Sequence, residues 1–494
     1  MRTVKCLVRG ARCWVLGAGA VCLVLGASAA FAQTQTPAPP DRSGPPALGA
    51  ARTLTLPPVA KRALSNGLPV WIVESHEVPV ASVALVIKSG GSADPAGKFG
   101  LASLTAAMLD EGAGSLDALG LADAVDFLGA SIGSGAGFDA STVTLYTPVS
   151  RLAAALDLMA DVATKPTFAP NELERLRKER LTSLMQIRDN PPAIGAAAFP
   201  RLIYGDTHRY GTGLAGTSAT VAAITGADLR AFHAAHYQPR NAQLIVVGDV
   251  QPDAVMAALE KSFGGWKPSA AAAAAAPSDF TAPKAGARTV YLIDKPGAAQ
   301  SIIRIGWAGV PRSTPDYFAL QVLNTILGGS FTSRLNTNLR ETHGYAYGAG
   351  SSFDMRLGPG PFVAAANVQT DKTAESLTEF FNELTGISTV PADELEKAKS
   401  YVALGFPQEF ETTRDIAAKL TEQIIYGLPD GWFDGYVAKI QAVTPADITR
   451  AAKTYITPGT FAVVVVGDLK AIEAKVRALN LGVVRVVPID DVLK

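Results

Sequence analysis

The 494-residue sequence predicts an α+β fold of two homologous modules, each a mainly antiparallel sheet packed with helices. Three observations lead to this prediction. The chain is longer than a single hydrophobic core normally supports. Strand-like and helix-like segments are interspersed, without the regular strand–helix–strand alternation of a doubly wound sheet. Segments of the first half also recur in the second half in the same order, which indicates a duplicated unit.

The internal repeat consists of four pairs of similar segments, separated by roughly 220 residues. In the last pair, each copy has a tyrosine, then a proline, then an apolar strand-like run, then Gly-Asp. The pairs are 170–178 with 391–399, 202–205 with 424–427, 225–237 with 444–455, and 237–250 with 455–469. Chance similarity of one apolar strand would not produce four matches in one order.

The elements of both halves follow from hydrophobic periodicity and from clusters of β-branched residues. In the first half we expect strands in LPVWIVES and ASVALVIKSG and helices near 100–111, 118–128, 149–163 and 171–187. In the second half we expect strands near 289–293, 301–308 and 361–368 and helices near 315–328 and 373–386.

Residues 1–32 are typical of a secretory signal peptide, so the mature protein is expected to be periplasmic or secreted, with no membrane association after cleavage. An apolar run follows four basic residues, and Ala30-Phe31-Ala32 supplies the small residues before a cleavage site at Gln33. A retained membrane anchor and a lipoprotein modified at Cys22 are the alternatives. Cleavage would remove all three cysteines, and core packing alone would then stabilise the fold.

Composition and low-complexity segments complete the expected organisation. Hydrophobic residues make up 48% of the chain and charged residues 18%, a globular balance that excludes wholesale disorder. The formal net charge is zero, which gives no support for nucleic-acid binding. We expect a flexible tether at 33–54, a first module at 55–266, an Ala/Pro-rich linker at 267–287 and a second module at 288–482.

The segment GKFGLASLTAAMLDEGAGS (97–115) resembles the signature segment of the insulinase/pitrilysin family of zinc metallopeptidases. In active members this helix carries an inverted H-x-x-E-H motif, in which the two histidines bind zinc and the glutamate acts as general base. A glutamate from a later helix completes the three protein ligands and leaves one coordination position for water.

The resemblance places other residues at all four of these positions. Ser103 and Ala107 stand at the two histidine positions, Ala106 at the base and Ser183 at the third ligand. Methyl and hydroxymethyl groups do not hold zinc at neutral pH. The resemblance therefore implies a degenerate zinc site, with no catalytic base and no metal in this chain.

The remaining residues suggest no replacement catalytic site. The five histidines include one pair at ligand-like spacing, His233 and His236, but no acidic residue lies between them, and we interpret them as structural. His208 lies in a loop that resembles a family loop, and it is also expected to be structural. The sequence contains no phosphate-binding Gly-Lys-Ser/Thr ending.

The segment LNTILGGSFTSRLNTNLRETHGYAYGAGSSF (323–353) closely resembles the second signature of the same family. In active members an arginine, and a tyrosine seven residues later, contact the scissile peptide and stabilise the developing oxyanion. The resemblance assigns these substrate-binding positions to Arg340 and Tyr347, with Tyr345 as second choice. The structural alternative pairs Arg340 with Glu341 on a solvated face and makes Tyr347 a core aromatic.

This pattern leads to one functional hypothesis and two alternatives. The chain is expected to be a non-catalytic, substrate-positioning subunit of a heterodimeric zinc metallopeptidase acting on unstructured peptides. A zinc-motif-bearing homologous subunit would supply the zinc, the base and the attacking water. The first alternative is a peptide-binding or structural scaffold of the same fold without a peptidase role. The second is a self-sufficient metallopeptidase with an unrecognised metal site.

Overall fold

The computed structural model describes residues 55–268, 280–284 and 286–494. The expected signal peptide (1–32), the expected tether (33–54) and most of the expected linker lie outside these residues. Among the described residues, no helix combines the length and the apolar character needed to cross a membrane.

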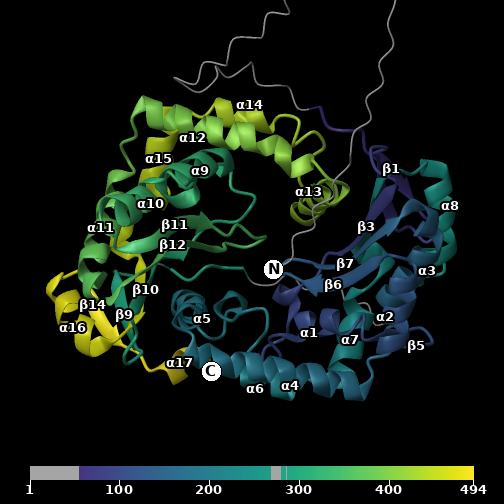
Figure 1. The fold of residues 1–494 in the computed structure, drawn as a ribbon, viewed down its shortest axis with the longest axis horizontal. Coiled ribbons are helices and arrows are strands. Elements are labelled where there is room, and N and C mark those ends of the chain that lie inside the picture. The colour runs from purple at the N-terminus through teal and green to yellow at the C-terminus, as the bar shows by residue number, and fades with distance from the viewer. Residues whose placement is uncertain (1–54, 269–279, 285) are drawn as a thin grey trace, which may run out of the picture. The chain divides into compact units, whose positions relative to one another are not determined.

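The first module contains one large sheet (Figure 1). It has six strands in the order β1-β2-β8-β3-β7-β6. Only the β2–β8 pair is parallel, and the other neighbours are antiparallel. The strands are β1 (Ala60–Ala63), β2 (Pro69–Glu74), β3 (Val80–Ile87), β6 (Ser131–Ala136), β7 (Ser141–Pro148) and β8 (Ala242–Gly248); a separate small ribbon pairs β4 (Gly112–Ala113) with β5 (Leu116–Asp117).

The second module repeats this arrangement in a sheet of order β11-β12-β10-β13-β9-β14. Its strands are β9 (Thr289–Asp294), β10 (Gln300–Ala308), β11 (Ala346–Phe353), β12 (Pro361–Gln369), β13 (Ala462–Gly467) and β14 (Val483–Val486). Five strands correspond in order and direction, because β9–β13 is parallel as β2–β8 is, and the next three pairs are antiparallel in both sheets. The predicted α+β fold of two homologous, mainly antiparallel modules is confirmed.

Helices flank both sheets. The first half contributes α1 (Leu101–Ala107), α2 (Ala118–Phe127), α3 (Leu152–Thr164), α4 (Pro170–Gln186), α5 (Pro191–Tyr204), α6 (Ser218–Ala223), α7 (Gly226–His236) and α8 (Pro252–Phe263). The second half contributes α9 (Tyr317–Asn324), α10 (Arg334–Asn336), α11 (Thr373–Gly386), α12 (Ala392–Gly405), α13 (Thr413–Tyr426), α14 (Tyr436–Gln441), α15 (Pro445–Tyr455), α16 (Leu469–Ala478) and α17 (Ile489–Leu493).

The duplication extends to helix capping. A capping box of Thr225 and Asp228 begins α7, and Thr444 and Asp447 form the same box at the start of α15. In each box the threonine and aspartate side chains satisfy backbone N–H groups that have no partner inside the helix. The repeated sequence TGAD/TPAD therefore starts two equivalent helices, each of which leads into a buried strand.

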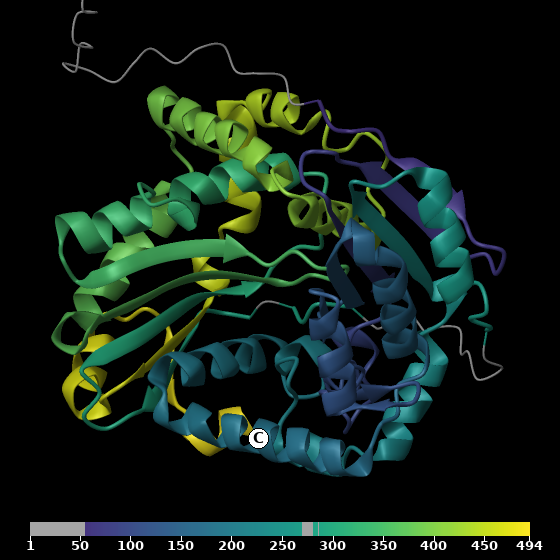
Figure 2. The same ribbon diagram turned by 45° about the vertical axis from the view of Figure 1, so that its right-hand side comes forward.

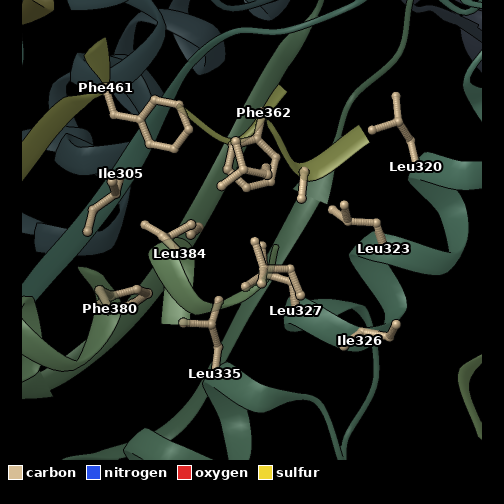
Figure 3. Close-up of a cluster of buried hydrophobic side chains, with 14 of the residues drawn as sticks. Ile305, Leu320, Leu323, Ile326, Leu327, Leu335, Phe362, Phe380, Leu384 and Phe461 are labelled. Atoms are coloured by element: carbon tan, nitrogen blue, oxygen red, sulfur yellow. The ribbon is translucent and has the colours of Figure 1, made fainter. Parts of the chain in front are cut away.

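Apolar side chains form a core on one face of each sheet. In the second module, residues of β10, β12, α9 and α11 converge on Phe362 and Phe461, which are fully buried (Figure 3). Strand β8 of the first module is buried along its whole length. Both faces of that sheet are covered, which explains why β8 is a continuous apolar run and not an alternating one.

The opposite face of each sheet is covered by a helix from the other half of the chain. Helix α13 packs on β3 and β8 of the first sheet (Figures 1 and 2). Its Leu420 and Ile424 belong to the same buried cluster as Val86 of β3 and Val247 of β8. Helix α5 packs on β10 and β13 of the second sheet through Phe199. These two helices carry the repeated LIYG and IIYG segments, so the exchange is reciprocal.

Some boundaries differ from those that the sequence suggests. The second module continues beyond residue 482, because β14 pairs with β9 and α17 packs on α5. Helix α1 is shorter than 100–111, since the chain turns after Met108 and Gly112 adopts a positive φ of 114°. The helix expected over 315–328 changes at Asn324 from α-helix to a π-helical turn over Thr325–Gly329.

Candidate functional site

A buried ion pair fixes the start of α1. The carboxylate of Asp94 accepts hydrogen bonds from the backbone N–H groups of Gly100 (2.8 Å) and Ala102 (2.7 Å). Arg209 donates to the same carboxylate from Nη2 at 2.8 Å, and both side chains are buried. Burial raises the pKa of Asp94, although the adjacent guanidinium opposes this shift. This ion pair positions the helix on which the family's zinc motif would lie.

At the first three positions of the zinc motif, the serine hydroxyl is hydrogen-bonded within the protein, and the two alanines have no atom that could bind a metal. Ser103 Oγ lies 2.7 Å from the carbonyl oxygen of Leu214 and accepts a hydrogen bond from Nη1 of Arg180 at 2.9 Å. Ala106 is fully buried, and Ala107 is partly buried. The helix therefore presents a hydroxyl and two methyl groups where an active member has two imidazoles and a carboxylate.

Ser183, at the position of the third zinc ligand, also offers no side chain that binds zinc. Ser183 lies on α4 with its side chain exposed, and its hydroxyl donates to the carbonyl oxygen of Glu179 one turn earlier in the same helix. The donor set does not fit zinc, which takes imidazole, thiolate or carboxylate ligands, and the Arg180 guanidinium places a positive charge beside Ser103. Among the described residues no group of three or more His, Cys, Asp or Glu is arranged to hold a metal ion.

The histidine pair on α7 makes structural contacts. Nε2 of His233 lies 2.9 Å from the carbonyl oxygen of Ala163, and Nδ1 of His236 lies 2.9 Å from Oγ of Ser89. Burial lowers the pKa of both imidazoles. His208 accepts a hydrogen bond from the backbone N–H of Tyr210. These contacts agree with the structural interpretation of the three histidines.

The second signature segment folds as a compact unit that ends in β11. A π-helical turn (Thr325–Gly329), α10 and a second π-helical turn (Thr337–Thr342) precede the strand. Gly328 permits close contact with β11, because a Cβ at this position would lie 2.1 Å from the backbone nitrogen of Ser351. This contact brings the start of the segment and the edge strand together.

Buried Asn336 links the two parts of this segment that carry exposed aromatic rings. Its Nδ2 donates to the carbonyl oxygen of Phe331 at 2.6 Å, and its Oδ1 accepts from the backbone N–H of Ala349 at 3.1 Å. Phe331 is 65% exposed and Tyr347, on β11, is 89% exposed. One amide side chain therefore sets the separation between the backbone that carries Phe331 and the strand that carries Tyr347.

The guanidinium of Arg340 lies beside both rings. Its central carbon is 4.5 Å from the ring centroid of Phe331 and 5.3 Å from that of Tyr347. Its Nε lies 3.3 Å from a carboxylate oxygen of Glu341, a partly exposed ion pair between adjacent residues that contributes little stability. The structural alternative predicted a pair between Arg340 and Glu341, which the structure contains. It also predicted that Tyr347 is a core aromatic, and this part is wrong because the side chain is exposed.

Tyr345 has a different environment. Its ring stacks on His343 with centroids 4.9 Å apart, and it packs against the core of the second module. The structure thus brings Arg340 together with Tyr347. The sequence reasoning missed Phe331 and Asn336, although a single aromatic residue between Ser330 and Thr332 in a polar stretch was a signal that could have singled out Phe331.

Comparisons with known proteins agree with this fold. Residues 70–210 match the family model described as insulinase (peptidase family M16), and residues 223–402 match the model described as the peptidase M16 inactive domain. An uncharacterised zinc protease of Mycobacterium leprae is 27% identical over 347 residues, 70% of this chain and 77% of that protein. One from Bacillus subtilis is 25% identical over 57% of this chain and 67% of that protein.

Solved structures show the same architecture. A peptidase M16 inactive domain from Pseudomonas fluorescens superimposes with a TM-score of 0.76 at 26% identity, covering 83% of this chain and 98% of that chain. A protease from Helicobacter pylori gives the same TM-score at 23% identity, covering 83% and 100%. Fold and site thus define a duplicated, peptidase-like α+β protein in which a partly exposed arginine lies beside an exposed tyrosine. The chain belongs to the insulinase/pitrilysin family, peptidase family M16.

Proposed function

We propose that this chain is the substrate-positioning subunit of a heterodimeric zinc metallopeptidase that acts on unstructured peptides. The partner is a homologous subunit with an intact zinc motif, which supplies the zinc, the general base and the attacking water. The expected signal peptide would place this subunit in the periplasm or outside the cell. One observation carries the proposal: partly exposed Arg340 lies beside exposed Tyr347, while Ser103, Ala106 and Ala107 offer no ligand set for zinc.

The chemistry of Arg340 and Tyr347 suits this role. Attack of water on a peptide carbonyl places negative charge on its oxygen, and donors positioned at that oxygen lower the barrier. Arg340 offers a permanently charged guanidinium with several N–H donors, and Tyr347 offers a phenolic O–H. The Tyr347 side chain is exposed, and the Arg340 side chain is 29% exposed and pairs with the exposed carboxylate of Glu341, so a partner subunit and its bound peptide can reach both groups.

The test compares the purified chain alone with the chain mixed with a zinc-motif homologue from the same genome. Bound zinc and hydrolysis of a quenched fluorescent peptide are measured in each sample. We expect no hydrolysis by the chain alone and zinc-dependent hydrolysis by the pair. In the pair, Arg340→Ala should lower kcat by about 10²–10³-fold, the typical effect of losing one oxyanion donor, and Tyr347→Phe should also lower it.

The control substitution is Arg477→Ala, which removes an exposed arginine of α16 that pairs with Glu473 in the same helix. It should leave kcat unchanged. Zinc-dependent hydrolysis by the chain alone would refute the proposal. A pair that hydrolyses peptide equally well with Arg340→Ala and Tyr347→Phe would instead support the scaffold alternative.

A further inference from the structure

The aromatic ring of Phe331 is not used by the oxyanion chemistry described above, yet it lies closer to the Arg340 guanidinium than the Tyr347 ring does. We propose that Phe331 is a positioning residue, which holds the Arg340 guanidinium in the orientation needed to donate to the substrate carbonyl. This inference rests on the proposed function, because it assigns Phe331 a task in the same site.

The surroundings of Phe331 indicate that its exposure is built into the fold. An exposed phenylalanine ring places a large apolar surface in water, which favours burial of the side chain when the backbone permits it. Here the backbone is fixed, because buried Asn336 donates to the Phe331 carbonyl at 2.6 Å. The ring therefore remains on the surface beside Arg340 and does not enter the core of the second module.

Glu341 competes with the substrate carbonyl for the N–H donors of Arg340, which explains why a positioning residue is needed. Glu341 follows Arg340 in sequence, and its carboxylate lies 3.3 Å from the arginine Nε. Arginine has a long, flexible side chain, and a neighbouring carboxylate draws its donors away from any other acceptor. A ring that attracts the guanidinium through its π face holds the cation without using an N–H donor, so those donors stay available for a peptide oxygen.

The test measures kcat and KM of the zinc-bearing pair with Phe331→Ala, Phe331→Leu and Phe331→Trp. Leucine keeps apolar volume without a π face, whereas tryptophan keeps the π face. We expect Ala and Leu to lower kcat by roughly two- to thirtyfold with little change in KM, the range for losing a cation–π contact between exposed and desolvated settings. Phe331→Trp should restore most of the activity.

The matched control is Phe127→Ala, which removes an 81% exposed phenylalanine ring from α2. It should leave both constants unchanged, and thermal unfolding should confirm that every variant is folded. In a pair that already carries Arg340→Ala, adding Phe331→Ala should cause no further loss, because the ring would act only through the guanidinium.

The outcomes separate this inference from the proposed function. If Arg340→Ala lowers kcat and Phe331→Leu behaves like the native chain, the inference fails and the proposed function stands. A rise in KM alone on Phe331→Ala also overturns the inference, since the ring would then bind peptide and not orient Arg340. If Arg340→Ala itself has no effect, the proposed function fails, and the inference fails with it.

Discussion

Removal of the buried Asp94 carboxylate should strongly destabilise the first module. Asp94→Ala leaves the Arg209 guanidinium, whose side chain is only 8% exposed, without its counter-charge. Loss of one partner from a buried ion pair costs about 3–5 kcal/mol, because the remaining charge stays desolvated. The N–H groups of Gly100 and Ala102 also lose their acceptor, and because both are buried this loss adds to the cost. We therefore expect a decrease of at least about 4 kcal/mol in the free energy of unfolding.

Urea unfolding followed by circular dichroism measures this change, with Glu473→Ala as the control. Glu473 pairs with Arg477 on the exposed surface of α16, so its loss should cost at most about 0.5 kcal/mol. The double variant Asp94→Ala/Arg209→Met removes both charges and should be more stable than Asp94→Ala alone. If Asp94→Ala is no more destabilising than Glu473→Ala, or if the double variant is the less stable of the two, the reasoning is wrong.

Three further predictions concern the exchanged helices, the histidines and the Asn336 link. Phe199→Ala in α5 and Leu420→Ala in α13 should each lower the unfolding free energy by about 2–5 kcal/mol, and because each helix covers the other module's sheet, both should shift one shared unfolding transition. Burial lowers the pKa of His233 and His236 below 6.5, so the unfolded chain binds protons at these imidazoles more tightly than the folded protein does. The midpoint of thermal unfolding should therefore fall as the pH falls below about 6.5, and it should fall less in the His233→Gln variant. Asn336→Ala should cost about 1–3 kcal/mol and lower peptide hydrolysis by the pair, because it frees the backbone of Phe331.

The sequence predicted the fold well where local patterns repeat. The paired segments around 225–250 and 444–469 correspond to α7 with β8 and α15 with β13, and they place equivalent strands in both sheets. The exchange of α5 and α13 was not foreseen. Hydrophobic periodicity predicts that a helix has an apolar face, but it does not predict which of two similar sheets that face packs against.

The candidate site was predicted in part. Arg340 and Tyr347 were singled out from their spacing within a resembling segment, and the structure places their side chains together. The role of Asn336 depends on hydrogen bonds to Phe331 and Ala349, residues five positions before it and thirteen after it. Such contacts follow from the tertiary arrangement of the turn and the edge strand, and hydrophobic periodicity does not reveal them.

The reciprocal exchange of α5 and α13 has a consequence during synthesis of the chain. The strands of the first sheet are complete once the ribosome passes Gly248, but α13, which covers one face of that sheet, ends at Tyr426. At typical elongation rates, the intervening segment of about 180 residues takes roughly 10–40 s to make. During that interval Ile245 and Val247 lack their native cover, so the half-made chain offers an apolar surface to chaperones or to other nascent chains.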